Sequence, residues 1–253
     1  RLEVEPDDDP AAVVLETGKM GRTRIDGGGG DETDQLLVVN SVTKSFGSVT
    51  AVDEVSLVVA RGETLGLIGP NGAGKTTLFE LIAGFVQPNA GSVIFDGVDI
   101  SRRTAEARSA MGLVRSFQNA SMFPTMTARD IIMLAQQHAA TTSAIDRSVN
   151  DTLRMFGLSA LADQPVRRLS TGTRRIVELA ANLALGPRLL LLDEPSAGIA
   201  QAETEALGSV IEKIRDSYGI TIVVIEHDMP MLSAICDRMI ALELGSIIAE
   251  GTP

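Results

Sequence analysis

The chain has 253 residues, of which 44% are hydrophobic and 22% are charged, and its formal net charge is −11. These values are typical of a globular protein with a sizeable core, and the acidic excess disfavours binding to nucleic acid, which depends on a positive surface. A single cysteine, Cys236, excludes a disulfide bond within the chain, and we interpret it as a small buried hydrophobic residue. No apolar run reaches the roughly 18 residues that a membrane-spanning helix needs.

The first 35 residues differ in composition from the rest of the chain. They contain the acidic run Pro6–Pro10 and four consecutive glycines, Gly27–Gly30, without an aromatic residue. Such a segment cannot bury enough apolar surface to offset the entropy lost on ordering, so we expect residues 1–35 to be a flexible tail or linker. The apolar run Ala11–Leu15 is too short for a secretory signal peptide. Because the chain starts with Arg1 rather than Met, we expect it to be a fragment or a trimmed form of a longer polypeptide.

Beyond residue 35 the sequence alternates between strand-like and helix-like patterns. A strand–turn–strand unit is predicted at 91–100. Further strands are predicted at short runs rich in Val, Leu and Ile: 36–42, 52–59, 63–69, 109–117, 188–194, 219–227 and 238–244. Helices are predicted where apolar residues recur at helical spacing: 76–85, 127–138, 145–156, 173–185 and 201–218. Continuous apolar strands that alternate with helices are typical of a buried parallel sheet. The sequence therefore predicts an α/β core with a mostly helical insertion near 118–184.

A glycine-rich loop joins the strand predicted at 63–69 to the helix that follows it. Its sequence, GPNGAGKT, matches the pattern G-x-x-x-x-G-K-[ST] in full. Glycines let the backbone wrap closely around an anion, and the positive end of the following helix adds to the attraction. Lys75 would supply charge to the outer phosphates, and the hydroxyl of Thr76 suits Mg²⁺. A chance match in a glycine-rich turn is the alternative, but the preceding strand and following helix favour nucleotide binding by this set of residues: Gly69, Pro70, Asn71, Gly72, Ala73, Gly74, Lys75, Thr76 and Thr77.

Two acidic residues follow four consecutive leucines. Ligands of open α/β sheets bind at the carboxyl ends of the strands, so Asp193 is predicted to lie beside the phosphates as a ligand of Mg²⁺. Glu194 is predicted to orient and deprotonate the attacking water. His227 also follows a predicted strand, and we expect it to hydrogen-bond the terminal phosphate. For Asp193 and Glu194 the alternative is an ordinary acidic strand end before a proline turn, and for His227 it is a structural or exposed histidine. We interpret His138 as a histidine of this ordinary kind.

Taken together, these motifs resemble those of the ATP-binding cassette (ABC) family. The resemblance covers about Leu36 to Pro253 and rests on motifs in the order and with the spacing of that family: the P-loop, Gln118, LSTGT at 169–173, LLLLDEP at 189–195, SAGI at 196–199 and EHD at 226–228. It implies a P-loop NTPase (RecA-like) core with an antiparallel β subdomain and an inserted α-helical subdomain. On this basis residues 36–253 form one ATP-binding domain, with a catalytic core of 36–117 and 185–253 and a helical subdomain of 118–184.

The resemblance also explains why a helix should begin with LSTGT. In the ABC family two cassettes pack head to tail, and the signature sequence of each covers the ATP that the other holds. The hydroxyl of Ser170 and the N–H of Gly172 would then meet the γ-phosphate across the interface, at a helix N-terminus. The family commonly has LSGGQ, so Thr171 and Thr173 are departures that bear on these contacts. An ordinary capped helix is the alternative.

Two further roles follow from the resemblance alone. Phe46 stands where the family stacks an aromatic ring on adenine, with core packing as the alternative. Gln118 resembles the residue that senses Mg²⁺ and the γ-phosphate, with a plain loop amide as the alternative. The implied metal ligands are Thr76, Gln118 and Asp193, and the implied catalytic residues are Glu194, His227 and Lys75.

Within the family, the segments 114–132, 195–200 and 226–229 are similar to those of the ATPase subunits of branched-chain amino acid importers. The resemblance implies an ATPase that uses ATP and Mg²⁺ to power an ABC transporter, as a subunit or as a domain fused to a membrane part. Its implied partners are a second ABC ATP-binding domain, identical or different, and transmembrane permease domains. We expect a peripheral location at the cytoplasmic face of the cell membrane and no binding to nucleic acid.

The sequence disfavours two other functions. A soluble ABC ATPase acting on nucleic acid or ribosomes is disfavoured, because only 94 residues lie between Lys75 and Ser170, without sustained heptads, and the chain is acidic. A non-hydrolysing cassette is disfavoured by the presence of both Glu194 and His227.

Overall fold

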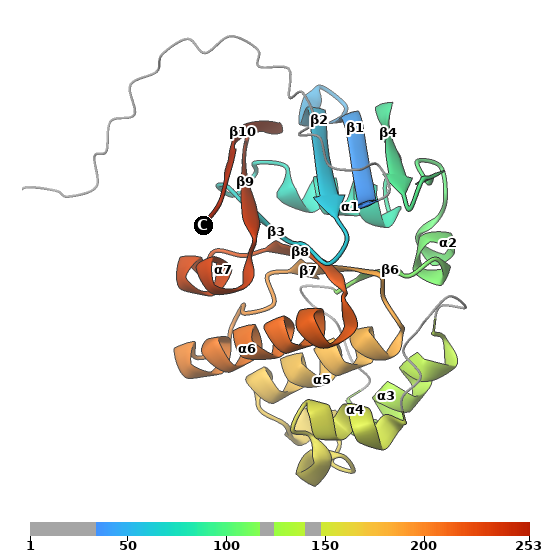
Figure 1. Cartoon of the computed structure of the whole chain (residues 1–253), viewed down its shortest axis with the longest axis vertical. Coiled ribbons are helices and arrows are strands. Elements are labelled where there is room, and N and C mark those ends of the chain that lie inside the picture. The colour runs from blue at the N-terminus through green and yellow to red at the C-terminus, as the bar shows by residue number, and fades with distance from the viewer. Residues whose placement is uncertain (1–33, 117–123, 140–147) are drawn as a thin grey trace, which may run out of the picture. The chain divides into compact units, whose positions relative to one another are not determined.

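The computed structural model describes residues 34–116, 124–139 and 148–253. Its centre is a six-stranded sheet with the order β10-β9-β3-β8-β7-β6 (Figure 1). The neighbouring pairs from β9 to β6 are parallel, and β10 runs antiparallel to β9. The strand bounds are Thr64–Ile68 (β3), Leu113–Arg115 (β6), Leu189–Asp193 (β7), Thr221–Ile225 (β8), Arg238–Glu243 (β9) and Ser246–Gly251 (β10). Every residue of β7 and β8 is buried, which confirms the buried parallel sheet expected from the continuous apolar runs.

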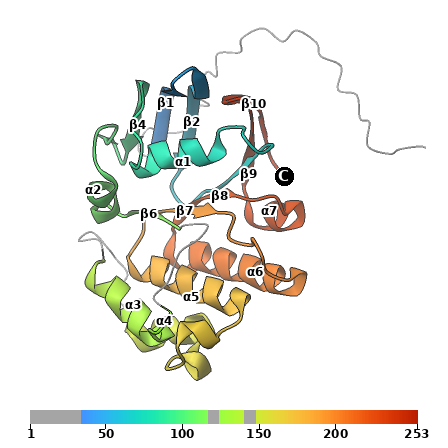
Figure 2. The same cartoon turned by 180° about the vertical axis from the view of Figure 1, so that it is seen from behind.

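Helices cover both faces of this sheet. Side chains alternate between the two faces of a strand, and accordingly Leu189 and Leu191 of β7 pack into one hydrophobic cluster while Leu190 and Leu192 pack into another. The first cluster contains α1 (Lys75–Ala83), and the second contains α5 (Thr171–Ala184), α6 (Gln201–Tyr218) and α7 (Met229–Ile235). Figures 1 and 2 show α1 on one side of the sheet and α5 and α6 on the other.

A second sheet lies beyond α1. It consists of β1 (Gln35–Phe46), β2 (Val49–Ala60), β4 (Ala90–Phe95) and β5 (Val98–Asp99) in the order β2-β1-β4-β5, with all neighbours antiparallel. Val39, Val93 and Phe79 belong to the same hydrophobic cluster, so α1 is held between the two sheets. The antiparallel β subdomain that the family resemblance implied is therefore confirmed.

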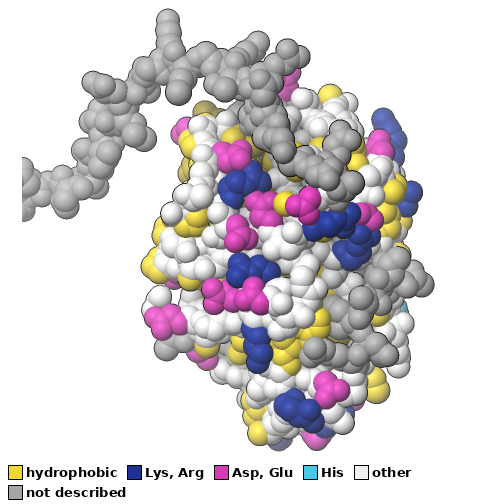
Figure 3. Space-filling view, in the orientation of Figure 1, with side chains coloured by type: hydrophobic (Ala, Val, Ile, Leu, Met, Phe, Trp, Pro, Cys, Tyr) yellow, Lys and Arg dark blue, Asp and Glu magenta, His cyan; other side chains and the backbone are white. Residues whose placement is uncertain are grey.

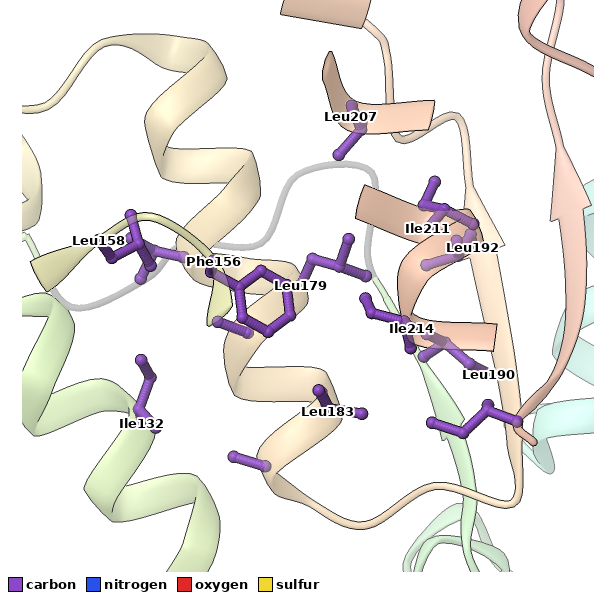
Figure 4. Packing of buried hydrophobic residues seen from close by; sticks show 14 of the residues in the cluster. Ile132, Phe156, Leu158, Leu179, Leu183, Leu190, Leu192, Leu207, Ile211 and Ile214 are labelled. Carbon is purple, nitrogen blue, oxygen red and sulfur yellow. The ribbon is translucent and has the colours of Figure 1, made fainter. Parts of the chain in front are cut away.

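The described residues between β6 and β7 form helices and turns. They comprise α3 (Ala128–Gln137), α4 (Val149–Met155), two short 3₁₀ turns at Ser159–Leu161 and Val166–Arg168, and α5. Thr127 and Asp130 form a capping box at the start of α3. Figure 4 shows Phe156, Leu183 and Leu190 in one continuous hydrophobic cluster, so these helices share a core with the sheet. The boundary of a helical subdomain at 118–184 remains a prediction.

Besides the two 3₁₀ turns, two α-helices and one strand were not predicted. They are α2 (Ala105–Ala110), α7 and β10, each only six or seven residues long. Such short elements have too few positions for a periodic apolar pattern to be recognised. Capping residues mark where the two helices begin: Thr104 caps α2, and Asp228 caps α7, which has a proline in its first turn. Within the described ranges, no helix combines the length and the apolar character needed to cross a membrane.

Candidate functional site

The glycine-rich loop lies between β3 and α1, as predicted. Gly69, Gly72 and Gly74 have φ values of 142°, 80° and 99°, a region that favours glycine. A Cβ on Gly69 would come within 2.2 Å of the carbonyl oxygen of Leu242, and one on Gly74 within 2.3 Å of that of Ala51. Gly74 is the N-cap of α1 and offers no side-chain hydrogen bond, so the first N–H groups of the helix are left for an anion.

Lys75 lies across this loop. Its Nζ donates hydrogen bonds to the carbonyl oxygens of Gly69 (2.5 Å) and Pro70 (3.0 Å), and only 6% of the residue is exposed. Burial lowers the pKa of Lys75, while the nearby carboxylates of Glu194 and Asp193 act in the opposite direction. The ammonium group and both predicted carboxylates therefore belong to one electrostatic site, although they are more than a hundred residues apart in sequence.

Asp193 ends β7 and forms an ion pair that the sequence did not reveal. Its Oδ2 accepts a hydrogen bond from Nη2 of Arg115 at 2.8 Å, and both side chains are almost fully buried. The backbone N–H of Asp193 donates to the hydroxyl of Ser116 at 3.2 Å. Arg115 and Ser116 lie at the end of β6, and Arg115 pairs with Leu191 of β7. The end of β6 thus fixes both the backbone and the carboxylate of Asp193.

The donor set fits Mg²⁺ bound together with phosphate. Thr76 supplies a hydroxyl in the first turn of α1 and Asp193 a carboxylate at the end of β7. Among the residues that the structure describes, no three carboxylate, histidine or cysteine side chains cluster into a metal cage. Mg²⁺ usually binds through one or two protein groups plus substrate phosphates, so this sparse set is appropriate. When bound, the ion would neutralise phosphate charge. Gln118, the third predicted ligand, lies outside the described residues.

The structure brings Glu194 and His227 together. Nε2 of His227 lies 3.3 Å from Oε1 of Glu194. Glu194 has a positive φ of 47°, and its N–H donates to the carbonyl oxygen of Ile225 at 2.9 Å, so the link between β7 and β8 extends past the last residue of β7. A carboxylate and an imidazole therefore meet at the carboxyl edge of the sheet, at the ends of two neighbouring strands.

A second buried acid supports this pair. Glu226 is 3% exposed, its Oε1 accepts a hydrogen bond from the N–H of Ser196 at 2.6 Å, and its Oε2 accepts one from the N–H of His227 at 3.0 Å. Glu226 was not among the site residues predicted from the sequence. An acid at the end of the otherwise apolar run 220–225 was the available signal.

The signature sequence forms the start of α5. Ser170 is the N-cap, and its hydroxyl accepts a hydrogen bond from the N–H of Thr173 at 3.1 Å. Gly172 is buried, and a Cβ on it would come within 2.5 Å of the carboxyl carbon of Glu203. The hydroxyl of Ser170 also lies 3.4 Å from Oε1 of Glu203. A single chain therefore shows a capped helix with a carboxylate against it, and the role of Ser170 and Gly172 toward the ATP of a second chain remains a prediction.

The remaining candidates have simple surroundings. Phe46 is 51% exposed at the end of β1, with Nζ of Lys44 5.1 Å from its ring centroid, so it is not a core residue. His138 directly follows the last residue of α3 and is exposed. Cys236 is buried, as expected, and burial raises the pKa of its thiol to about 12.

Comparison with known proteins gives a consistent result. The ABC transporter family matches residues 52–197, which is more than half of the chain. The chain is 36% identical to the high-affinity branched-chain amino acid transport ATP-binding protein BraF of Pseudomonas aeruginosa and 34% identical to LivG of Escherichia coli, which carries the same description. In both cases the match covers 86% of this chain and 92% of the relative. It is also 37% identical to the lipopolysaccharide export system ATP-binding protein LptB of Escherichia coli, over 86% of this chain and 90% of LptB.

Solved structures agree with the sequence relatives. The ATP-binding cassette MJ1267, solved in its ADP conformation, has a TM-score of 0.78 at 28% identity, over 87% of this chain and 91% of that one. The cassette MJ0796, solved as a dimer bound to ADP and phosphate, has a TM-score of 0.72 at 23% identity over 86% and 98%. Nothing in these likenesses supports the nucleic-acid alternative, and on the face in Figure 3 basic and acidic side chains are interspersed. The chain therefore belongs to the ABC transporter family and is one of its ATP-binding, ATP-hydrolysing chains.

Proposed function

We propose that this chain powers an ABC importer of branched-chain amino acids from the cytoplasmic face of the cell membrane, as a subunit or as a domain fused to a membrane part. The match to BraF and LivG, which spans nearly their whole length, supports this choice. LptB is as similar, and its name gives a different cargo. The two uses differ in the permease that the ATPase binds, so the identity of that permease decides between them.

The observation that carries the catalytic part of the proposal is the meeting of Glu194 and His227 beside the buried Lys75. The loop 69–77 and Lys75 bind the phosphates of ATP, and Thr76 and Asp193 hold Mg²⁺ together with Gln118. Glu194 accepts the proton of the attacking water, and His227 holds the terminal phosphate in line. Glu194 lies within hydrogen-bonding reach of the imidazole, so one water can contact both groups.

Hydrolysis in this proposal requires two chains. Phe46 is exposed enough to stack on the adenine of the chain's own ATP. Ser170 is exposed at the N-terminus of α5, where N–H groups and the helix dipole attract a phosphate, and it serves the ATP held by the second chain. The Glu203 carboxylate must then move away from Gly172, because a carboxylate and a phosphate repel each other. The second chain is an identical or a different ABC ATP-binding domain.

A groove between α2 and α3 is the proposed docking site of the permease. It has a volume of about 920 Å³ and is lined mainly by apolar atoms from α2, β6, α3 and α5. Phe85 and Leu134 line it and are 53% and 37% exposed. Arg115, which pairs with Asp193, also lines the groove, and its guanidinium lies 5.7 Å from the ring centroid of Phe85. A helix pressed into the groove would therefore touch the residue that holds the metal-binding carboxylate.

Co-purification from the native host tests the transporter role. The tagged full-length chain is expected to recover a permease from detergent-solubilised membranes, and Phe85→Glu is expected to lose it because a charge replaces apolar contact in the groove. Ile248→Glu, on an exposed residue of β10, is the matched control and should retain the permease. With the permease in liposomes, leucine, isoleucine or valine uptake should depend on ATP. Recovery of no membrane protein, with ATPase activity stimulated by DNA or ribosomes, would contradict the proposal.

A further inference from the structure

Glu226 is a buried acid for which the proposed ATP chemistry has no use. It follows the last residue of β8 and precedes His227, and only 3% of its surface is exposed. Placing a carboxylate in the protein interior is unfavourable unless hydrogen bonds compensate for the lost water. The question is therefore what its two oxygens do.

Each oxygen of Glu226 accepts a backbone hydrogen bond from a different part of the site. Oε1 accepts from the N–H of Ser196 at 2.6 Å, and Oε2 accepts from the N–H of His227 at 3.0 Å. Because the two N–H donors reach different atoms of the side chain, both of these atoms must be acceptors, as they are in a carboxylate. A glutamine amide of the same shape provides only one, because its nitrogen is itself a donor.

These bonds close a ring around the catalytic pair. From Glu194 the chain passes through Pro195 to Ser196, and the Ser196 N–H reaches Glu226. The other oxygen of Glu226 reaches the N–H of His227, whose Nε2 lies 3.3 Å from Oε1 of Glu194. The bond from the N–H of Glu194 to the carbonyl oxygen of Ile225 ties the two strand ends together beside this ring.

We propose that Glu226 is a positioning residue for ATP hydrolysis. By holding Ser196 and His227 at once, it fixes the distance between the His227 imidazole and the Glu194 carboxylate. This inference rests on the proposed roles of Glu194 and His227. Displacement of a reacting group by about 1 Å can reduce a rate roughly 100-fold, so a single lost acceptor in the ring has a kinetic consequence.

The variant Glu226→Gln separates positioning from a merely structural role. If Glu226 only filled space, removal of a buried charge by an isosteric amide would leave stability equal or higher and turnover unchanged. If it positions His227, kcat should fall about 10- to 100-fold while KM and the affinity for ATP stay as in the wild type. Glu63→Gln is the control for loss of a carboxylate acceptor away from the site, in the turn between β2 and β3. One oxygen of Glu63 accepts the N–H of Ala60 at 2.7 Å and the other pairs with Nε of Arg238 at 2.8 Å, so this variant can cost stability but should leave kcat unchanged.

A spectroscopic measurement makes the test independent of activity. The chain has only two histidines, so the ring signals of His227 are readily assigned by NMR, and His138 at the end of α3 is an internal reference. In Glu226→Gln the ring signals of His227 should shift while those of His138 stay in place. Unmoved His227 signals, or wild-type kcat, would overturn the inference. Failure of the proposed function gives a different result, because Glu194→Gln would then hydrolyse ATP as fast as the wild type.

Discussion

Glu194 adopts a backbone conformation that residues other than glycine, asparagine and aspartate rarely adopt. Its φ of 47° costs on the order of 1 kcal/mol relative to an ordinary conformation. The conformation turns the chain sharply after β7, so that the Glu194 side chain faces His227 and the N–H of Ser196 reaches Glu226. Backbone strain of this kind is concentrated at functional sites.

Replacement of Glu194 by glutamine tests its assignment as the general base. Because the amide cannot accept the proton from water, turnover should fall at least about 100-fold. ATP binding should persist, since the loop and Lys75 are unchanged, and chains should accumulate as ATP-bound pairs. Radiolabelled ATP hydrolysis, nucleotide binding and gel filtration give the three readouts. Glu243→Gln, on the exposed last residue of β9, is the control. Wild-type turnover in Glu194→Gln would remove Glu194 from this role.

The site residues that could be predicted are those whose neighbours in the sequence form a recognisable motif. Lys75 stands in a recognisable loop, and Asp193 and Glu194 follow a buried strand. Arg115 and Glu226 were not found, because their partners lie 78 and 30 residues away and become neighbours only when the strands pair. A single sequence does not contain that pairing, so the supporting residues of a site are harder to predict than the residues they support.

At the scale of elements, α6 begins without the cap that most helices have. Ala200 is its N-cap, in the extended conformation that suits this position, and makes no side-chain hydrogen bond. The SAGI turn that precedes α6 contains no acidic residue. The first N–H groups of α6 therefore lack a side-chain acceptor at the N-cap, and serine at this exposed position would provide one.

Ala200→Ser is accordingly expected to stabilise the protein by about 0.5–1 kcal/mol. Urea unfolding followed by circular dichroism measures the free energy of unfolding. Ala249→Ser, on an exposed residue of β10, adds the same hydroxyl away from any helix start and should change stability little. If Ala200→Ser raised the free energy of unfolding no more than this control, water would satisfy the N–H groups in the first turn of α6 equally well.

Elements with a long, regular pattern were predicted well. The bounds expected for α6 agree with the structure, and the buried runs of β7 and β8 were located within one or two residues at each end. The order of strands was not predicted, because β3 lies between β8 and β9 although about 155 residues separate it from β8. Contacts of that sequence separation depend on the whole chain.

At the scale of the molecule, Asp96 joins three distant segments. It lies in the turn between β4 and β5 and forms ion pairs with Arg61, after β2, and with Arg188, before β7. Hydrogen bonds from Arg188 and Arg61 lower the pKa of Asp96 from 3.8 to about 2. The turn of the small sheet is thereby connected to the start of β7 in the large sheet.

This pKa gives stability a defined dependence on pH. A carboxylate with a lowered pKa in the folded state stabilises the fold above about pH 4, and this contribution disappears as the pH falls from about 4 to about 2. Because the side chains remain about a third exposed, solvent screening limits the effect to on the order of 1 kcal/mol. Asp96→Asn, which tolerates the positive φ of 52°, should lower stability at pH 7 and match the wild type near pH 2. If Asp96→Asn were as stable as the wild type at pH 7 as well as near pH 2, the ion-pair assignment would be contradicted.

The hydrophobic cluster that runs from Phe156 through Leu183 to Leu190 limits how this protein can be recombined with its relatives. A chimera that imported residues 118–184 from another cassette would meet a host surface shaped for the original helices, in particular Ile211 and Ile214 on α6. The imported helices and α6 would have to be transplanted together. A functional exchange therefore has to include α6 as well as residues 118–184, because the side chains that pack against each other come from both segments.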